Sequence, residues 1–145
     1  MCLLVDANKV SSILQEDQDS QPILEWLESP GSHIVLGGTK LRNEYQRHSR
    51  FLQFLDELAR AGKLKIANDD RVDREQQSIV AAGILVSDDP HIIALARISG
   101  CRLIYSADTS LHDDFKNPRI LRPKGKVYQR SNHKRLLRSA PPCNT

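Results

Sequence analysis

The chain has 145 residues, of which 39% are hydrophobic and 27% charged, and its formal net charge is +3 at pH 7. This length and composition are typical of one globular domain, and no apolar run approaches the roughly 18 residues that a membrane-spanning helix needs. The N-terminus also lacks the basic and apolar pattern of a signal peptide. The three cysteines, Cys2, Cys101 and Cys143, are odd in number and none share Cys-x-x-Cys spacing. We therefore expect neither a disulfide framework nor a cysteine zinc site, and we expect a cytoplasmic protein without membrane contact.

The charge is unevenly distributed along the chain. From Arg119 onward there are eight Lys or Arg residues and no acid, whereas the preceding segment holds 13 basic residues against 18 acidic ones, a net charge of −5. An acidic body with a basic extension suggests carboxylate chemistry beside a segment that attracts polyanions. We expect a folded domain over residues 1–121 and a basic, partly disordered tail over residues 122–145.

Strands and helices are predicted to alternate along the chain. Short apolar runs that predict buried strands lie at 3–5, 33–36, 64–67 and 103–105, with shorter candidates at 120–121 and 127–128. Apolar residues at helical spacing predict helices at 9–15 with Asn8 as the cap, and at 22–27, 39–61, 72–84 and 90–99, with short helices or turns at 111–115 and 136–137. This alternation predicts an α/β fold, a three-layer α/β/α sandwich with a mostly parallel central sheet.

Acidic residues follow the predicted strands or lie near the starts of helices. Asp6 and Asp108 each come directly after a buried strand, so parallel neighbours would bring both carboxylates to the same rim. Glu44 lies at the edge of the buried face of the long helix, and Asp88 and Asp89 begin the helix at 90–99. Carboxylates gathered in this way repel one another, so the cluster is best explained as a cage for a hard divalent cation, Mg²⁺ or Mn²⁺. Such a site suits hydrolysis of a phosphodiester.

Five motifs lie within residues 1 to about 121: LLVDAN at 3–8, KLRNEY at 40–45, DPHIIALA at 89–96, LIYSAD at 103–108 and HDDF at 112–115. In this order they resemble the motifs of the PIN-domain ribonuclease family. The resemblance implies an open α/β/α sandwich in which acids hold Mg²⁺ or Mn²⁺ and cut RNA, leaving a 5′-phosphate and a 3′-hydroxyl. Carried over by position, the catalytic and metal-binding acids are Asp6, Glu44, Asp89 and Asp108.

The resemblance also assigns supporting residues. Asn8 matches the family's Asp-x-Asn opening and would brace the first acid, and Ser106 stands where the family has Thr or Ser before the fourth acid. Asp88 is an alternative third ligand, and Asp113 is a candidate for a second metal site.

Basic residues near the acids and in the tail are candidates for RNA contact through the phosphates. They are Lys40, Arg42, Arg47, Arg119, Lys124, Lys126, Arg130, Lys134 and Arg135. Tyr128 is a candidate stacking surface. The alternative role of these cations is solubility or docking to a partner.

Each acid also has a purely structural explanation. Asp89 precedes Pro90, so it is well placed to cap a helix, which would stabilise that helix by about 1 kcal/mol. Asp6 and Asp108 suit the end of a strand or a turn, and Glu44 suits a solvated helix face. Asp113 and Asp114 are expected to be exposed, and His48, His91 and His112 to lie at the surface or the edge of the core. Four acids in the family's order favour one shared cause.

The sequence therefore predicts a Mg²⁺- or Mn²⁺-dependent endoribonuclease that resembles the toxin of a bacterial toxin–antitoxin pair. Its expected partners are an RNA substrate, a protein antitoxin and a second copy of the chain. The alternative is a catalytically inactive PIN-like module that binds RNA or protein. An aspartyl-phosphate phosphatase ranks last, because it normally has a second Asp two residues after the first, where this chain has Asn8.

Overall fold

The computed structural model describes residues 1–144, which fold around a five-stranded sheet in which every strand pairs in parallel. The strands are β1 (Cys2–Val5), β2 (His33–Leu36), β3 (Leu64–Ile66), β4 (Leu103–Tyr105) and β5 (Lys126–Tyr128). Their order across the sheet is β3-β2-β1-β4-β5, so β1 is central and the direction of winding reverses between β1 and β4. The predicted α/β fold with a parallel central sheet is confirmed.

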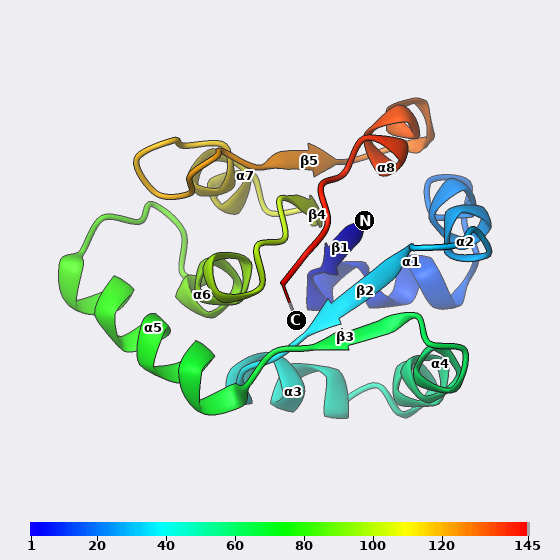
Figure 1. The fold of residues 1–145 in the computed structure, drawn as a ribbon, viewed down its shortest axis with the longest axis horizontal. Helices are drawn as coiled ribbons and strands as arrows, with labels where there is room; N and C mark the ends of the chain where they lie inside the picture. The colour runs from blue at the N-terminus through cyan, green and yellow to red at the C-terminus, as the bar shows by residue number, and fades with distance from the viewer. Residues whose placement is uncertain (145) are drawn as a thin grey trace.

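Eight α-helices cover the sheet in the described part of the chain. They are α1 (Val10–Leu14), α2 (Gln21–Leu27), α3 (Thr39–Gln46), α4 (Ser49–Arg60), α5 (Asp69–Ala82), α6 (Pro90–Ser99), α7 (Thr109–Phe115) and α8 (Arg135–Arg138), with 3₁₀ turns η1 (Ala7–Lys9) and η2 (Ser131–His133). Helices α5 and α6 lie on one side of the sheet, with α1, α2 and α4 on the other (Figure 1), as right-handed connections require. None of the helices among residues 1–144 is long and apolar enough to cross a membrane.

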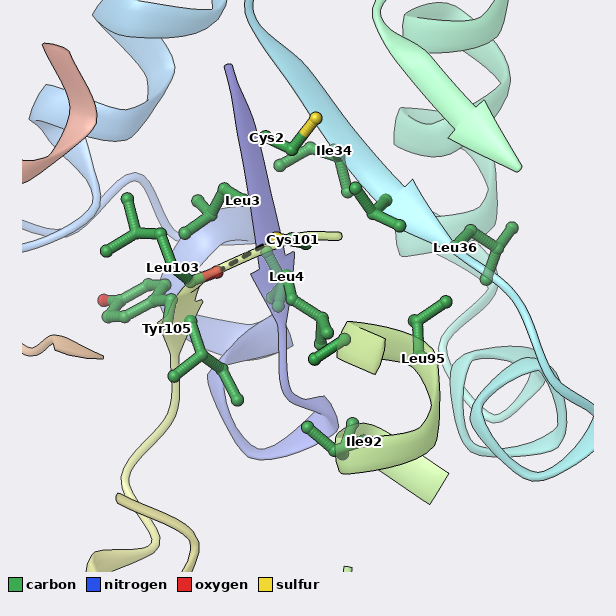
Figure 2. Packing of buried hydrophobic residues seen from close by; sticks show 14 of the residues in the cluster. Cys2, Leu3, Leu4, Ile34, Leu36, Ile92, Leu95, Cys101, Leu103 and Tyr105 are labelled. Carbon is green, nitrogen blue, oxygen red and sulfur yellow. Dashed lines mark hydrogen bonds between the residues drawn. The ribbon is translucent and has the colours of Figure 1, made fainter. Parts of the chain in front are cut away.

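The core is centred on β1, which is buried at all four positions. Figure 2 shows Leu3 and Leu4 of this strand among the side chains of its neighbours, with Ile92 and Leu95 of α6 on the side of Leu4. A strand covered on both faces has no polar positions to alternate with apolar ones. This is why the uninterrupted apolar run at the N-terminus identified the strand.

The long helix predicted over residues 39–61 is wrong, because the chain breaks at Arg47–His48 into α3 and α4. The buried residues of α3 are Leu41 and Tyr45, and a continuous helix would bury position 52 next. Leu52 is instead 39% exposed, and Phe51 is fully buried against Tyr45, with ring centroids 4.9 Å apart. The break therefore shifts the apolar face by one residue.

Two apolar segments also differ from the prediction. Val80 and Ile84 are 61% and 46% exposed, and α5 ends at Ala82 before the left-handed Gly83. Ile120 and Leu121 are buried but lie in a turn rather than a strand. Apolar character alone does not decide between these environments.

The basic segment after residue 121 is built into the fold. Strand β5 forms the edge of the sheet beside β4, and Leu137 of α8 is 2% exposed. Tyr128 is fully buried, stacks edge-on against Tyr105 at 5.3 Å and donates its hydroxyl hydrogen to the carbonyl of Asp19 at 2.6 Å. These contacts belong to residues within the segment 122–145, which was predicted as a tail.

The prediction that the cysteines form no disulfide is wrong, because Cys2 and Cys143 are joined, with their Cα atoms 5.9 Å apart. The C-terminal segment runs back past β4 and β1 (Figure 1), and the amide of Asn144 donates to the carbonyl of Ser99 at 2.6 Å. The two cysteines are 141 positions apart in sequence, so only the tertiary fold brings them together. Cys101 is free and buried, and burial raises the pKa of its thiol to about 11.

Tyr128→Ala should lower the free energy of unfolding by about 3–5 kcal/mol, as expected when a buried aromatic side chain is removed. Tyr128→Phe should cost only about 1 kcal/mol, because it loses one hydrogen bond and keeps the ring. Urea denaturation measures both values. Two variants as stable as the wild type would show that the segment after residue 121 does not pack on the domain.

Candidate functional site

Asp6 and Asp108 follow neighbouring parallel strands at the carboxyl edge of the sheet. β1 and β4 are parallel neighbours with Val5 opposite Tyr105, and the amide of Asp6 donates to the carbonyl of Tyr105 at 3.0 Å. Asp6 follows β1, and Asp108 follows β4 after a two-residue turn. The winding of the sheet reverses between these strands, which is where open α/β sheets bind their ligands.

Ser106 joins these two strand ends. Its hydroxyl donates to Oδ2 of Asp6 at 2.7 Å and accepts a hydrogen bond from the amide of Asp108 at 3.1 Å. Its carbonyl accepts a hydrogen bond from Nε2 of His112 at 2.6 Å. Because Nε2 of His112 is the donor, Nδ1 can accept from the side-chain amide of Gln129, 3.4 Å away. His112 is thus buried and holds the β4 turn, unlike the surface position predicted for it.

The environment of Asp6 opposes its ionisation. Burial raises the pKa of this carboxyl, the hydrogen bond from Ser106 partly reverses the shift, and the charge of Glu44 adds to it. The side chain is only 5% exposed. Asp6 is therefore a fixed carboxylate whose charge needs a positive or hydrogen-bonding partner.

Two glycines direct the chain from β2 into α3, which carries Glu44. A side chain on Gly37 would approach the Cβ of Ala67 to 2.8 Å. Gly38 has a φ of +89°, and a Cβ there would lie 2.7 Å from Val72. The amide of Gly38 donates to Asp69 at 2.9 Å. This close packing fixes the start of α3 and hence the position of the second acid.

Glu44 pairs with a histidine that the sequence analysis placed at the surface. Oε1 of Glu44 is 2.7 Å from Nε2 of His91, and His91 is 1% exposed. Burial lowers the pKa of His91, so its neutral ring donates from Nε2, while Nδ1 is buried without a partner among the described residues. Tyr45 donates its hydroxyl hydrogen to the carbonyl of Val5 and so fastens α3 to the end of β1.

Asp89 occupies the cap position of α6, with Pro90 as the first helical residue, but its side chain makes no capping hydrogen bond. The predicted structural role of its carboxylate is therefore not realised. Burial raises the pKa of Asp89 to about 7, and the next contributions are its hydrogen bond to Asp108 and the negative charges of Asp6, Asp108 and Glu44. Asp89 thus interacts with the acids rather than with its own helix.

Asp108 combines a structural role with this interaction. Oδ1 accepts hydrogen bonds from the amides of Ser110 at 3.0 Å and Leu111 at 3.3 Å, which caps α7. The hydrogen bond from Asp89 is the main cause that lowers the pKa of Asp108. Below a pH of about 7 the two carboxyls therefore share a proton that resides mainly on Asp89.

The four acids share one electrostatic environment, yet their side chains do not form a ready metal cage. Within residues 1–144, no three His, Cys, Asp or Glu side chains are arranged closely enough to hold a metal ion as they stand. Each acid has its own partner: Ser106 for Asp6, His91 for Glu44, and the shared proton for Asp89 and Asp108. These separate contacts relieve the repulsion.

The chemistry of the donor set fits a hard divalent cation. All four groups offer carboxylate oxygens, the donors that Mg²⁺ and Mn²⁺ prefer. The raised pKa values of Asp6 and Asp89 show that negative charge at this rim is costly. A cation at the rim would lower that cost.

The remaining predicted acids lie apart from this group. Asp88 is exposed and lines a hollow with Ile79 and Pro90, and Asp113 is exposed on α7. Neither is among the charges that shift the pKa of Asp89. Asn8 accepts a hydrogen bond from the amide of Ala107 at 3.2 Å, so it braces the turn after β4. It also does not cap α1, which begins after η1.

Asp114 supports the site in a way that the sequence analysis missed. It was predicted to be exposed, but it is 2% exposed. Its two oxygens accept hydrogen bonds from the amides of Val86 at 3.0 Å and Ser87 at 2.9 Å. It thereby fixes the loop that leads to Asp89. The helical spacing of Leu111, Asp114 and Phe115 was the available signal, because these residues share one face of α7.

Most of the predicted RNA contacts are exposed cations. Exposed side chains belong to Lys40, Arg47, Arg119, Lys124, Lys126, Arg130, Lys134 and Arg135. Arg42 is instead paired with Asp69 at 2.8 Å. Arg130 and Lys9 line a hollow of about 390 Å³ that also includes Ser106 and Thr109, directly beside Asp108. Sequence reasoning missed Lys9, whose ammonium lies 5.1 Å from the ring centre of Tyr105.

Comparisons with known proteins add little to this description. No protein-family model matches the sequence, and no curated protein matches it. Among solved structures, the chain is similar to a VapBC2 structure from Rickettsia felis bound to a DNA fragment from their promoter. The TM-score is 0.48 at 12% identity, and the match covers 90% of this chain and 100% of the other.

Asp89→Asn should stabilise the metal-free protein at pH values above 7 and leave its stability unchanged in acid. Folded wild-type protein keeps the Asp89 proton up to a pKa of about 7, whereas the ordinary value is 3.8. Wild-type stability therefore falls as the pH rises from about 4 to about 7, because the unfolded chain binds fewer protons across that range. Allowing for solvent screening, we expect the variant to gain about 1–2 kcal/mol above this range.

Urea denaturation in EDTA at about pH 4 and about pH 8, on either side of this transition, measures the difference. Asp70→Asn, which changes an exposed acid of α5, is the matched control and should show no such pH dependence. An equal effect of Asp89→Asn at both pH values would contradict the elevated pKa.

Proposed function

We propose that the protein is a Mg²⁺- or Mn²⁺-dependent endoribonuclease whose acids are Asp6, Glu44, Asp89 and Asp108. The observation that carries the proposal is the placement of Asp6 and Asp108 at the ends of neighbouring parallel strands, where Ser106 donates to Asp6 and accepts from the amide of Asp108. The four acids come from two strand ends and the starts or faces of two helices. The sequence motifs shared with PIN-domain ribonucleases support the choice of RNA as the substrate.

The side chains of the site have distinct roles in this proposal. Asp6 is held by Ser106, and Glu44 is held by His91, so both carboxylates are oriented before a cation binds. A bound cation would supply Lewis-acid stabilisation of the phosphoryl oxygens and a nucleophile near neutral pH. Asp89 would give up its proton when the cation binds, because positive charge favours the ionised form. Asp88 remains an alternative third ligand, and Asp113 remains a candidate for a second metal site.

The substrate would approach along the rim beside Asp108. Lys9 and Arg130 line the adjoining hollow and would hold phosphates on either side of the bond to be cut. The loop that carries Arg130 is fixed, because the amide of Ser131 donates to Asp19 at 3.1 Å and that of Gln129 to Nδ1 of His133 at 3.1 Å. Such preorganisation reduces the entropy cost of binding.

The family resemblance extends the proposal to biological context. A toxin of this kind would act with a protein antitoxin and as a homodimer, and the antitoxin would keep it inactive. The remaining exposed cations after residue 119 would contribute contacts to RNA or to such a partner.

The alternative function is a PIN-like module that binds RNA or protein without cutting it. The lack of a ready metal cage among residues 1–144 favours this alternative, and the intact set of four acids favours the enzyme. Calorimetry with Mn²⁺ separates the two, because only the enzyme requires a cation at the rim.

Asp6→Asn and Asp108→Asn should each lower the rate of RNA cleavage in Mn²⁺ by about 100-fold or more, because each removes one charge from the cation site. EDTA should abolish cleavage by the wild-type protein. The rate is measured on a labelled single-stranded RNA, with Asp70→Asn as the matched control of equal charge change.

Equal cleavage by the wild type and both rim variants would rule out this site. Absence of cleavage together with absence of Mn²⁺ binding would favour the binding module.

Replacing both Lys9 and Arg130 by Gln should raise KM for RNA and change kcat little, because these cations bind substrate away from the reacting phosphate. The slope of log affinity against log salt concentration should fall by about 1–2, the number of phosphate contacts removed. Fluorescence anisotropy in EDTA measures the affinity without cleavage. Arg50→Gln/Arg71→Gln, which removes two exposed cations elsewhere, is the control. An effect of equal size in this control would contradict a specific subsite.

A further inference from the structure

A second hollow, of about 390 Å³, lies away from the acidic rim and is lined chiefly by arginines. Its lining residues are Glu75, Arg97, Arg102, Arg119, Ile120 and Arg122. Arg97 lies near the end of α6, which begins beside Asp89, and Arg102 immediately precedes β4, which leads to Asp108. Asp89 and Asp108 lie before the start of α6 and after the end of β4, whereas the hollow lies near the end of α6 and before the start of β4.

Two of the four arginines are held in place by the backbone. Arg97 donates from Nε to the carbonyl of Ile120 at 2.9 Å, and its Nη1 contacts Glu75 at 3.0 Å. Arg102 donates from Nε to the carbonyl of Pro123 at 2.8 Å and from Nη2 to that of Arg122 at 3.1 Å. Its Nη1 donates to the carbonyls of Ala96 at 2.6 Å and Cys101 at 3.0 Å, so most of its donors are already used. Both guanidinium groups thus have fixed orientations before any ligand binds.

The other two arginines come from the loop between α7 and β5. Arg119 and Arg122 are exposed, and the loop between them is anchored by the buried side chains of Ile120 and Leu121. The side chain of Asn117 accepts a hydrogen bond from the amide of Arg119 at 2.9 Å, which shapes the start of this loop. Arg119 and Arg122 therefore line the same hollow as the fixed side chains of Arg97 and Arg102.

The charges of this hollow are not balanced within the protein. Four arginines and one acid, Glu75, line the hollow, and Glu75 is already paired with Arg97. Burial lowers the pKa of Arg102, and the neighbouring charge of Arg97 adds to this shift. Grouped cations of this kind are stabilised by an anion, and planar guanidinium groups match phosphate oxygens in pairs.

We propose that the hollow formed by Arg97, Arg102, Arg119 and Arg122 is a binding site for a phosphate group, separate from the acidic rim. The phosphate would come from the backbone of an RNA chain or from a small phosphate such as pyrophosphate. Both ligands offer the same oxygens, and the hollow provides enough arginines to contact several of them.

The test measures binding of pyrophosphate by calorimetry and of a short single-stranded RNA by fluorescence anisotropy, both in EDTA so that cleavage plays no part. Arg119→Gln/Arg122→Gln changes only exposed side chains, so the fold should be retained, and an unchanged melting temperature verifies this. Arg50→Gln/Arg71→Gln removes the same charge from other exposed positions. We expect pyrophosphate binding to weaken roughly tenfold or more in the first variant, as for the loss of charged hydrogen bonds, and little in the control.

RNA binding that weakens in the same variant and is displaced by pyrophosphate would support the site with RNA as its ligand. Pyrophosphate binding that depends on these arginines, with RNA binding unchanged, would support it with a small phosphate. Equal binding of both ligands by the two variants, or no pyrophosphate binding into the millimolar range, would overturn it. Because all of these measurements are made without cleavage, they do not depend on the proposed nuclease activity.

Discussion

The hydrogen bond from Ser106 to Asp6 joins the two strands on whose ends the candidate site depends. It crosses the point where the winding of the sheet reverses, and the same hydroxyl accepts from the amide of Asp108. The carbonyl of Ser106 is in turn held by the buried ring of His112. One serine therefore sets the spacing of the first and fourth acids, and a shift of β4 relative to β1 would alter both.

The residues around this contact also reduce the repulsion among the four carboxyl groups. Four carboxyl groups at one rim would destabilise the fold if all were ionised without partners. The neutral ring of His91 supports Glu44, and the proton retained by Asp89 removes one negative charge near neutral pH. The remaining free-energy cost of holding these carboxyl groups together is typical of active sites, because a bound cation can then change their protonation.

The sequence was sufficient to predict the strands and the sheet type, which depend on the local pattern of apolar residues. The apolar runs before Asp6 and Asp108 identified β1 and β4, and the order of elements predicted the parallel sheet. The break between α3 and α4 did not follow from the apolar spacing, although Phe51 packs against Tyr45 across it. Nor did the buried roles of His91 and Asp114, or the disulfide between Cys2 and Cys143. His91, Asp114 and Cys2 each contact a partner far away in sequence, so the local pattern around each residue does not reveal that contact.

Helix α6 lies between two groups of opposite charge. Its start lies beside the acids and its last turn carries Arg97, so the positive end of the helix dipole faces carboxylates and the negative end faces a guanidinium group. The same arrangement separates an acidic rim, suited to a cation, from an arginine-lined hollow, suited to a phosphate. The acids and the arginine-lined hollow therefore lie near opposite ends of one helix. An RNA chain would be drawn to the cations, and a cation at the rim would reduce the repulsion between its backbone and the acids.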